Sequence, residues 1–150
     1  MKYEDLTHRI IGCAMKVHSF LGNGFQEVIY QRALAIEMNR ENLEYSREME
    51  MTIFYHDIEI GTRRVDFFVE NKIMVELKAL IKLDEVHLCQ TMNYCQAYNL
   101  PIGLLINFGA RSLEFKRVYN LNHPENQAFR KTNQNIILPS SDPTNPNSDR

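Results

Sequence analysis

The spacing of apolar residues changes along this chain, and that change constrains the fold more than any other feature. Residues 4 to 21 carry apolar side chains at helical spacing, and the Gly22-Asn23-Gly24 sequence that follows is typical of a helix end. The stripe consists of Leu6, Ile10, Cys13, Ala14, Val17 and Leu21. A second helix is predicted from about Phe25 to Asn42, and its buried candidates are Val28, Ile29, Ala33, Leu34, Ile36 and Met38. Beyond Leu43 the period becomes two, which indicates β-strands.

The second part of the chain reads as strands interrupted by one helix. Alternation from Met49 to Tyr55 predicts a strand, and His56-Asp57 predicts a turn. Asp84 is a good N-cap for a third helix that ends near Asn99. The remaining strands are predicted at 58–61, 64–70, 73–80, 103–108 and 113–119. The order α-α-β-β-β-β-α-β-β predicts an α/β domain with one central mixed sheet flanked by helices.

The length of 150 residues favours a single domain. We assign residues 1–120 to this domain and 121–150 to a polar C-terminal tail. Asn, Pro, Ser and Asp dominate after Leu138, so that part is predicted to be disordered. The apolar run Ile136-Ile137-Leu138 docks on the domain or remains a stray patch.

Composition and charge exclude several classes of protein. No apolar run approaches the roughly 20 residues that span a bilayer, and the N-terminus has no apolar signal region, so we expect a cytoplasmic protein without membrane contact. Cys13, Cys89 and Cys95 lack zinc-site spacing and are expected to be reduced core thiols. The 17 Lys and Arg against 19 Asp and Glu give a net charge of -2, which disfavours nucleic-acid binding by bulk positive charge. The only basic candidates form a loose set: Arg63, Arg64, Lys72, Lys82, Arg111, Lys116 and Arg117.

Two predicted strands, 64–70 and 73–80, carry the most informative charges. Strict alternation places Val65, Phe67 and Val69 on one face and Asp66 on the other. A three-residue connection would pair Val69 with Ile73 and set Asp66 directly across from Glu76, with Cβ atoms about 5 Å apart. Carboxylates that close repel each other unless a cation or a proton separates them, and together they suit Mg²⁺ or Mn²⁺. A two-residue connection would put them on opposite faces, and the simpler alternative is a solvated face.

Two helices add polar residues at helical spacing. Glu27 and Tyr30 share a face of the second helix, although a carboxylate in a first turn is also favoured by the helix dipole. In the third helix Gln90 and Tyr94 are four residues apart and lie away from the apolar stripe. An exposed polar face is the alternative there. The apolar stripe itself is predicted to be Leu88, Cys89, Met92 and Cys95.

The series Asp66, Glu76-Leu77-Lys78 and Gln90-Thr91-Met92-Asn93-Tyr94 resembles the core of the PD-(D/E)xK nuclease superfamily in its RecB-like form. The upstream Gly24-x-x-Glu27-x-x-Tyr30 looks like the signature of the GxxExxY protein family within it, and the 102–109 segment is also similar. The resemblance covers about residues 3 to 119. Val65 stands where the nominal motif has Pro, which removes no chemistry. The resemblance implies a restriction-endonuclease-like core.

The resemblance also implies roles for individual residues. Asp66, Glu76 and the backbone carbonyl of Leu77 would hold a catalytic Mg²⁺, for which Mn²⁺ would substitute, with Glu27 as a further ligand. Lys78 would orient or deprotonate the attacking water. Substrate-binding residues would be Gln90, Tyr94, Tyr30 and Arg64.

Together these expectations predict a metal-dependent nuclease that hydrolyses phosphodiester bonds. DNA is the favoured substrate, and RNA is the alternative substrate. The alternative is a catalytically silent nucleic-acid-binding or protein-interaction module that retains the fold. A third reading is a subunit whose protein partner supplies the basic surface. Polarity, endo- or exonucleolytic cutting, metal number and oligomeric state stay open at this level.

Overall fold

The computed structural model describes residues 3–126, which form three helices, five strands and one short 3₁₀ turn. In chain order these are α1 (Glu4–Leu21), α2 (Glu27–Arg40), β1 (Tyr45–Tyr55), β2 (Ile58–Val69), β3 (Ile73–Lys78), α3 (Glu85–Ala97), β4 (Ile102–Asn107), β5 (Glu114–Tyr119) and η1 (Pro124–Asn126). The predicted α/β class is confirmed. One detail differs, because the predicted strands 58–61 and 64–70 form the single strand β2. The ladder with β1 runs through the residues between them, pairing Thr62 with Thr52 and Arg63 with Met51.

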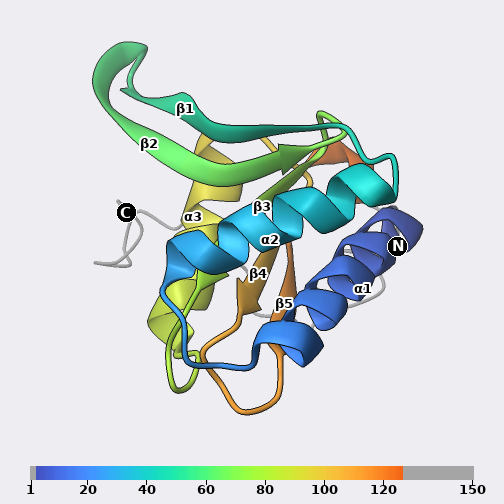
Figure 1. Ribbon diagram of the computed structural model, residues 1–150. Helices are drawn as coiled ribbons and strands as arrows, with labels where there is room; N and C mark the ends of the chain where they lie inside the picture. Colours follow the sequence, from blue (N-terminus) through green and yellow to red (C-terminus); the bar gives the residue numbers. More distant parts are fainter. Residues whose placement is uncertain (1–2, 127–150) are drawn as a thin grey trace.

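The five strands make one mixed sheet in the order β1-β2-β3-β4-β5. Only β3 and β4 pair in parallel, and the other neighbours are antiparallel. Parallel strands need a crossover, which α3 supplies between them. In Figure 1, α1 and α2 lie in front of the sheet and α3 lies behind it. The sheet is therefore covered on both faces at its centre.

The β1–β2 hairpin extends beyond these layers (Figure 1). Its turn is His56-Asp57, as predicted, and both residues have positive φ angles, which suit a two-residue hairpin connection. The apolar side chains near the tip, including Phe54, Ile58 and Ile60, are exposed. The same strands thus form core at one end and a solvent-exposed arm at the other.

Helix α2 buries a different stripe from the one predicted. Tyr30, Leu34 and Met38 are fully buried at successive four-residue steps, and Gln31 and Ala35 are buried beside them. The predicted core residues Val28 and Ile36 are instead 39% and 60% exposed, and that part of the prediction is wrong. The reason is tertiary, since α2 packs against both α1 and the sheet and those partners select the buried face.

The buried face of α3 is narrow. Only Thr91 and Cys95 are buried, and both lie against β4 at Gly103, where an added Cβ would come within 2.8 Å of the Cys95 sulfur. The predicted core position of Cys89 is wrong, because that thiol is exposed. Cys13 and Cys95 are buried, and all three cysteines are free thiols.

The first residues of the predicted tail belong to the packed structure. Leu121 and Asn126 are buried, and the Asn126 amide donates hydrogen bonds to the carbonyls of Pro101 and Asn120. The predictions for residues 136–138 and for disorder after 138 lie outside the described residues. Within residues 3–126, none of the helices combines the length and apolar character required to cross a bilayer.

Candidate functional site

The turn between β2 and β3 sets the register that the site requires. Glu70, Asn71 and Lys72 form the connection, and Glu70 and Asn71 both have positive φ angles. The Lys72 amide donates to the Val69 carbonyl at 3.0 Å, and Val69 pairs with Ile73. The three-residue connection is therefore confirmed, and the alternative two-residue register is excluded.

Asp66 lies where the regular alternation of β2 breaks. Val65 packs in a small cluster with Met74 and Cys95, whereas Phe67 packs in the larger core on the other side. The prediction that these two residues share a face is therefore wrong. The physical reason is a ladder irregularity, because Glu48, which falls opposite Asp66, has a positive φ angle and is absent from the β1–β2 pairing.

The Asp66 carboxylate is held by two hydrogen bonds. One oxygen accepts from the Leu77 amide at 2.7 Å, and the other accepts from the Gln31 side chain at 3.2 Å. Gln31 is itself buried and accepts from Arg47 at 2.8 Å. No sequence motif indicated Gln31. Its position one helical turn after Glu27, on the same face of α2, was the available signal.

Glu76 lies on β3 and is almost completely buried, with 3% of its surface exposed. One of its oxygens forms an ion pair with the Arg63 guanidinium at 3.0 Å, while Oε1 is buried without a hydrogen-bond partner. A buried carboxylate oxygen without a partner is costly, and such groups call for an explanation. At Glu76 the explanation lies in the charged groups that surround this carboxylate.

Three carboxyl groups influence one another at this place. Burial, followed by the negative charge of Asp66, raises the pKa of Glu76 to about 7, although Arg63 and Lys78 act in the opposite direction. Loss of water and then the charge of Asp66 raise the pKa of Glu27. Burial also raises the pKa of Asp66, against the lowering effect of the Leu77 amide. The carboxylates thus share a field that a cation would relieve.

The structure brings together the four residues predicted to be catalytic. Lys78 on β3 lowers the pKa of the carboxyl groups of Glu27 on α2, Asp66 on β2 and Glu76 on β3, and Asp66 raises the pKa of the other two. Lys78 is half-buried, and Glu27 is the most exposed of the carboxylates. The burial of Asp66 and Glu76 shows that they do not form a solvated face.

The predicted substrate-binding residues are divided between the site and other places. Tyr94 lies at the site, because the Arg63 guanidinium stacks 5.0 Å above its ring. Gln90 is exposed on α3. Arg64 points elsewhere, at 61% exposure and 3.7 Å from Glu50 on β1, so its neighbour Arg63 is the arginine that reaches the carboxylates. The loose basic set contained Arg63 without distinguishing it.

Tyr30 does not face a substrate surface. It is fully buried, its ring stacks on Phe108 with centroids 4.7 Å apart, and its hydroxyl donates to the Gly22 carbonyl at 2.6 Å. The same hydroxyl accepts from the Phe25 amide at 3.1 Å. Tyr30 therefore anchors the α1–α2 turn and sets the start of α2, where Glu27 lies. We correct its predicted role accordingly.

A second buried group organises the segment that follows Lys78. The Asn107 side chain accepts hydrogen bonds from the amides of Leu80 and Gly109 and donates to Leu80 and Glu114. Gly109 is required by close approach, because a Cβ there would lie 2.3 Å from the Leu80 nitrogen. We call Asn107, Gly109 and Leu80 the loop clasp. It fixes the chain directly after Lys78.

The donor chemistry at the site fits a hard divalent cation. Carboxylate oxygens and a backbone carbonyl are the ligands that Mg²⁺ and Mn²⁺ prefer, and Glu76 has an oxygen without a protein partner. The arrangement is not a finished three-ligand cage, since residues 3–126 contain no group of three His, Cys, Asp or Glu placed to hold a metal. The carboxylates are coupled by charge, and Arg63 contacts one of them.

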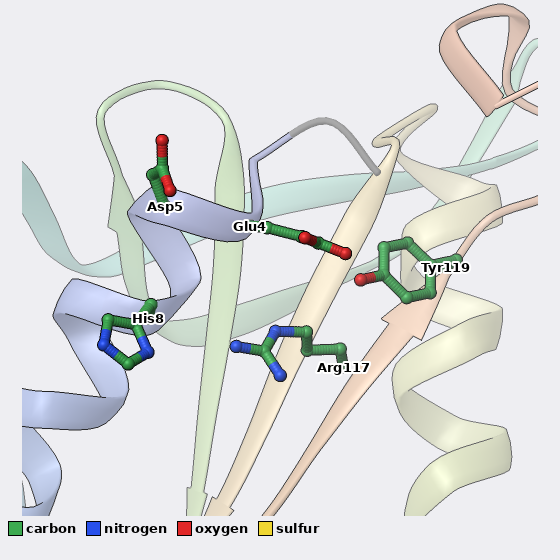
Figure 2. Close-up of a pocket in the computed structure, with 5 residues that line it drawn as sticks. All are labelled: Glu4, Asp5, His8, Arg117 and Tyr119. Carbon is green, nitrogen blue, oxygen red and sulfur yellow. The ribbon is translucent and has the colours of Figure 1, made fainter.

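A separate polar pocket of about 340 Å³ lies between α1 and β5. Figure 2 shows its lining residues, which are Glu4, Asp5, His8, Arg117 and Tyr119. The Arg117 guanidinium donates to the Thr7 hydroxyl at 2.8 Å. None of the residues predicted for catalysis lines this pocket.

Comparisons with known proteins agree with this architecture. The crystal structure of SSO0001 has a similar fold, with a TM-score of 0.51 and 16% identity over 91% of this chain and 71% of that one. No curated protein matches the sequence significantly. A family profile for the PD-(D/E)XK nuclease superfamily matches residues 4–118, which include the whole carboxylate site. The α/β sheet is accordingly of the restriction-endonuclease-like type, and the chain belongs to the PD-(D/E)XK nuclease superfamily.

Proposed function

We propose that this protein is a divalent-metal-dependent nuclease that hydrolyses phosphodiester bonds, with DNA as the favoured substrate. The observation that carries the proposal is the Glu27–Asp66–Glu76 carboxylate group beside Lys78. Burial, and then repulsion by the neighbouring carboxylates, raises the pKa of Glu76 in this group to about 7. Holding buried carboxylates this close is unfavourable for a structural domain and useful for a cation site.

The ligands in this proposal are Asp66, Glu76 and the Leu77 carbonyl, with Glu27 as a further ligand from α2. PD-(D/E)XK nucleases generally use divalent metals, and oxygen ligands favour Mg²⁺, with Mn²⁺ able to substitute. A bound divalent cation lowers the pKa of water and provides positive charge for phosphoryl chemistry. The Leu77 amide and Gln31 keep the Asp66 carboxylate oriented for this role.

Lys78 provides positive charge and proton donors next to the carboxylates. We propose that it orients the attacking water and stabilises negative charge that develops on the phosphate. Its position is supported from two sides, since β3 pairs with β4 in register Lys78–Asn107 and the loop clasp holds the residues that follow. A preorganised charge of this kind acts without reorganisation during the reaction.

Substrate contacts are proposed for Tyr94 and Gln90 on α3, and not for Arg64, whose side chain pairs with Glu50 on β1. The net charge of -2 remains a poor match for a polyanion, so we expect salt-sensitive binding or a protein partner that adds basic surface. The Gly24, Glu27 and Tyr30 spacing further supports assignment to the GxxExxY subfamily. In that pattern Glu27 reaches the site, while Tyr30 fixes the helix that carries it.

The test is cleavage by the purified full chain with Mg²⁺ or Mn²⁺, on single-stranded, duplex and branched DNA and on RNA. We expect Asp66→Ala and Lys78→Ala each to lower the rate at least about a hundredfold. Lys16→Ala is the matched control, because Lys16 is an exposed lysine of α1 paired with Glu41 at 3.3 Å. Equal activity of the wild type and both site variants would refute the nuclease proposal.

The second candidate function is a catalytically silent binding module. The Arg63–Glu76 ion pair favours it, because a protein cation already contacts the most buried carboxylate. Calorimetry with Mn²⁺ separates the two candidates. Binding that disappears in Asp66→Asn supports the nuclease, and the absence of binding by the wild type supports the module.

A further inference from the structure

Arg63, like Gln31, is a residue at this site that the motif pattern does not explain. It extends from β2, where its backbone pairs with Met51, and its guanidinium reaches Glu76 on β3. Its contacts include an ion pair with Glu76 at 3.0 Å, a hydrogen bond to the Arg64 carbonyl at 2.8 Å and stacking on the Tyr94 ring at 5.0 Å. Its side chain is one-third exposed, while that of Glu76 is 4% exposed.

The ion pair is incomplete as a structural salt bridge. An arginine that binds a carboxylate in the strongest geometry uses two parallel hydrogen bonds. Here one Glu76 oxygen is paired, the other is buried without a partner, and Arg63 Nε is also buried without a partner. The pair therefore neutralises charge without satisfying the hydrogen-bonding groups, which is a poor arrangement for stability alone.

The charges around the Arg63–Glu76 pair indicate that a divalent ion would compete with Arg63 for Glu76. Lys78 and Arg63 are the cations that act on each of Glu27, Asp66 and Glu76, so three carboxylates stand against two positive charges, and a divalent ion would reverse the excess negative charge. A guanidinium and a divalent ion next to the same carboxylate repel each other. A partly exposed arginine lying on an aromatic ring can move toward solvent, whereas the buried glutamate cannot.

We propose that Arg63 is an internal counter-ion that holds Glu76 in the metal-free protein and competes with the divalent cation for this carboxylate. The inference rests on the proposed function for the identity of the metal ligands and adds a positioning residue that sets metal affinity. Arg63 thus reduces the repulsion among the carboxylates before metal binds, and it makes metal binding weaker and easier to reverse.

The experiment measures Mn²⁺ affinity by calorimetry on the full chain, at one fixed pH well above 7 for all variants. We expect Arg63→Gln to bind Mn²⁺ more tightly by on the order of tenfold, the size of effect that groups around a metal's ligands exert. Arg63→Lys keeps the positive charge and should return the affinity toward that of the wild type. Arg64→Gln is the matched control for affinity. It removes the same charge at the next residue, whose side chain is exposed.

Thermal unfolding in a chelator gives a second measurement. Loss of the counter-ion should lower the midpoint of metal-free Arg63→Gln, and saturating Mn²⁺ should recover more stability in this variant than in the wild type. Unchanged or weaker Mn²⁺ binding by a folded Arg63→Gln would overturn the proposal, as would an equal gain in Arg64→Gln. If Arg63→Gln does not fold, a wild-type affinity in Arg63→Lys together with tighter binding in Arg63→Met supports the proposal, and any other pattern overturns it.

The outcome is separable from that of the nuclease proposal. If the wild type binds Mn²⁺ but cleaves nothing, the nuclease fails and the affinities still decide the role of Arg63. If only Arg63→Gln binds Mn²⁺, the counter-ion role is supported in a protein that is not an active nuclease. If no variant binds Mn²⁺, both proposals are wrong.

Discussion

Two buried polar residues on neighbouring strands differ in how completely their side chains are hydrogen-bonded. Asn107 on β4 is fully buried, and both polar atoms of its side chain are hydrogen-bonded, to Leu80, Gly109 and Glu114. Glu76 on β3 is nearly as buried, but it has one ion pair and one oxygen without a partner. Satisfied buried groups stabilise a fold, and unsatisfied ones cost stability.

This difference indicates that the two regions contribute to stability with opposite sign. The loop clasp around Asn107 holds the backbone after Lys78 by hydrogen bonds, so it contributes stability. The carboxylate group stores unfavourable charge, which a bound cation can release. Functional sites commonly sacrifice stability in this way. Stability and metal-binding measurements should therefore separate the two regions.

The largest effect is expected at the loop clasp. Asn107→Ala leaves the Leu80 and Gly109 amides without their acceptor, so the free energy of unfolding should fall by about 3 kcal/mol. Chemical denaturation measures this change. Asn39→Ala, at an exposed asparagine on α2, serves as the control. A loss below about 1 kcal/mol for Asn107→Ala would mean that water replaces the clasp and would weaken the comparison.

Bound metal should stabilise the protein through the carboxylate group and not through the loop clasp. Mn²⁺ at about 100 times its Kd should raise the free energy of unfolding by about 2.7 kcal/mol in the wild type. The same increment should persist in Asn107→Ala and vanish in Asp66→Asn. Thermal unfolding with and without a chelator measures it. Loss of the increment in Asn107→Ala would show that the two regions are not independent.

Glu76→Gln should change stability with the sign opposite to that of Asn107→Ala. Because the folded protein raises the pKa of Glu76 from 4.5 to about 7, its contribution to stability is fully present below about pH 4.5 and is lost as the pH rises through 7. In the absence of metal, the variant should therefore exceed the wild type by about 2 kcal/mol near pH 8 and by little near pH 5. Denaturation at both pH values measures the difference. A variant less stable than the wild type near pH 8 would contradict the stored-charge interpretation.

The smallest effect is expected at Gln31, which orients Asp66 without touching the other carboxylates. Gln31→Met should weaken Mn²⁺ binding by about tenfold, since the Leu77 amide still holds the other Asp66 oxygen. Gln26→Met, at the start of the same helix and without a side-chain capping bond, is the control. Equal Mn²⁺ affinities in both variants would remove Gln31 from the site.

Much of the fold could be predicted because its signals are short-range. The ends of α1, the Asp84 cap of α3 and the His56-Asp57 turn depend on residues only a few positions apart. The Val69–Ile73 register follows from the length of one turn. These features need only backbone geometry and local side chains, which the sequence displays directly.

The sequence could predict which residue types form the site, but not which residues contact one another. Asp66, Glu76 and Lys78 followed from the motif, and the structure gathers them as expected. Gln31 and Arg63 were not singled out, because each acts through a residue far away in the chain. The same limit explains why Tyr30 was assigned to substrate and proves to be core.

From the sequence alone came most of the elements, the two possible hairpin registers, and the acidic residues and Lys78 of the site, because these follow from periodicity, turn chemistry and residue type. Only the tertiary structure decided which arginine meets Glu76, which face Val65 and Phe67 take, and which stripe of α2 is buried. The physical reason is that burial and charge pairing depend on what packs alongside. An irregular pairing at Glu48 and Asp66 changes the faces of β2 in a way that local alternation does not record.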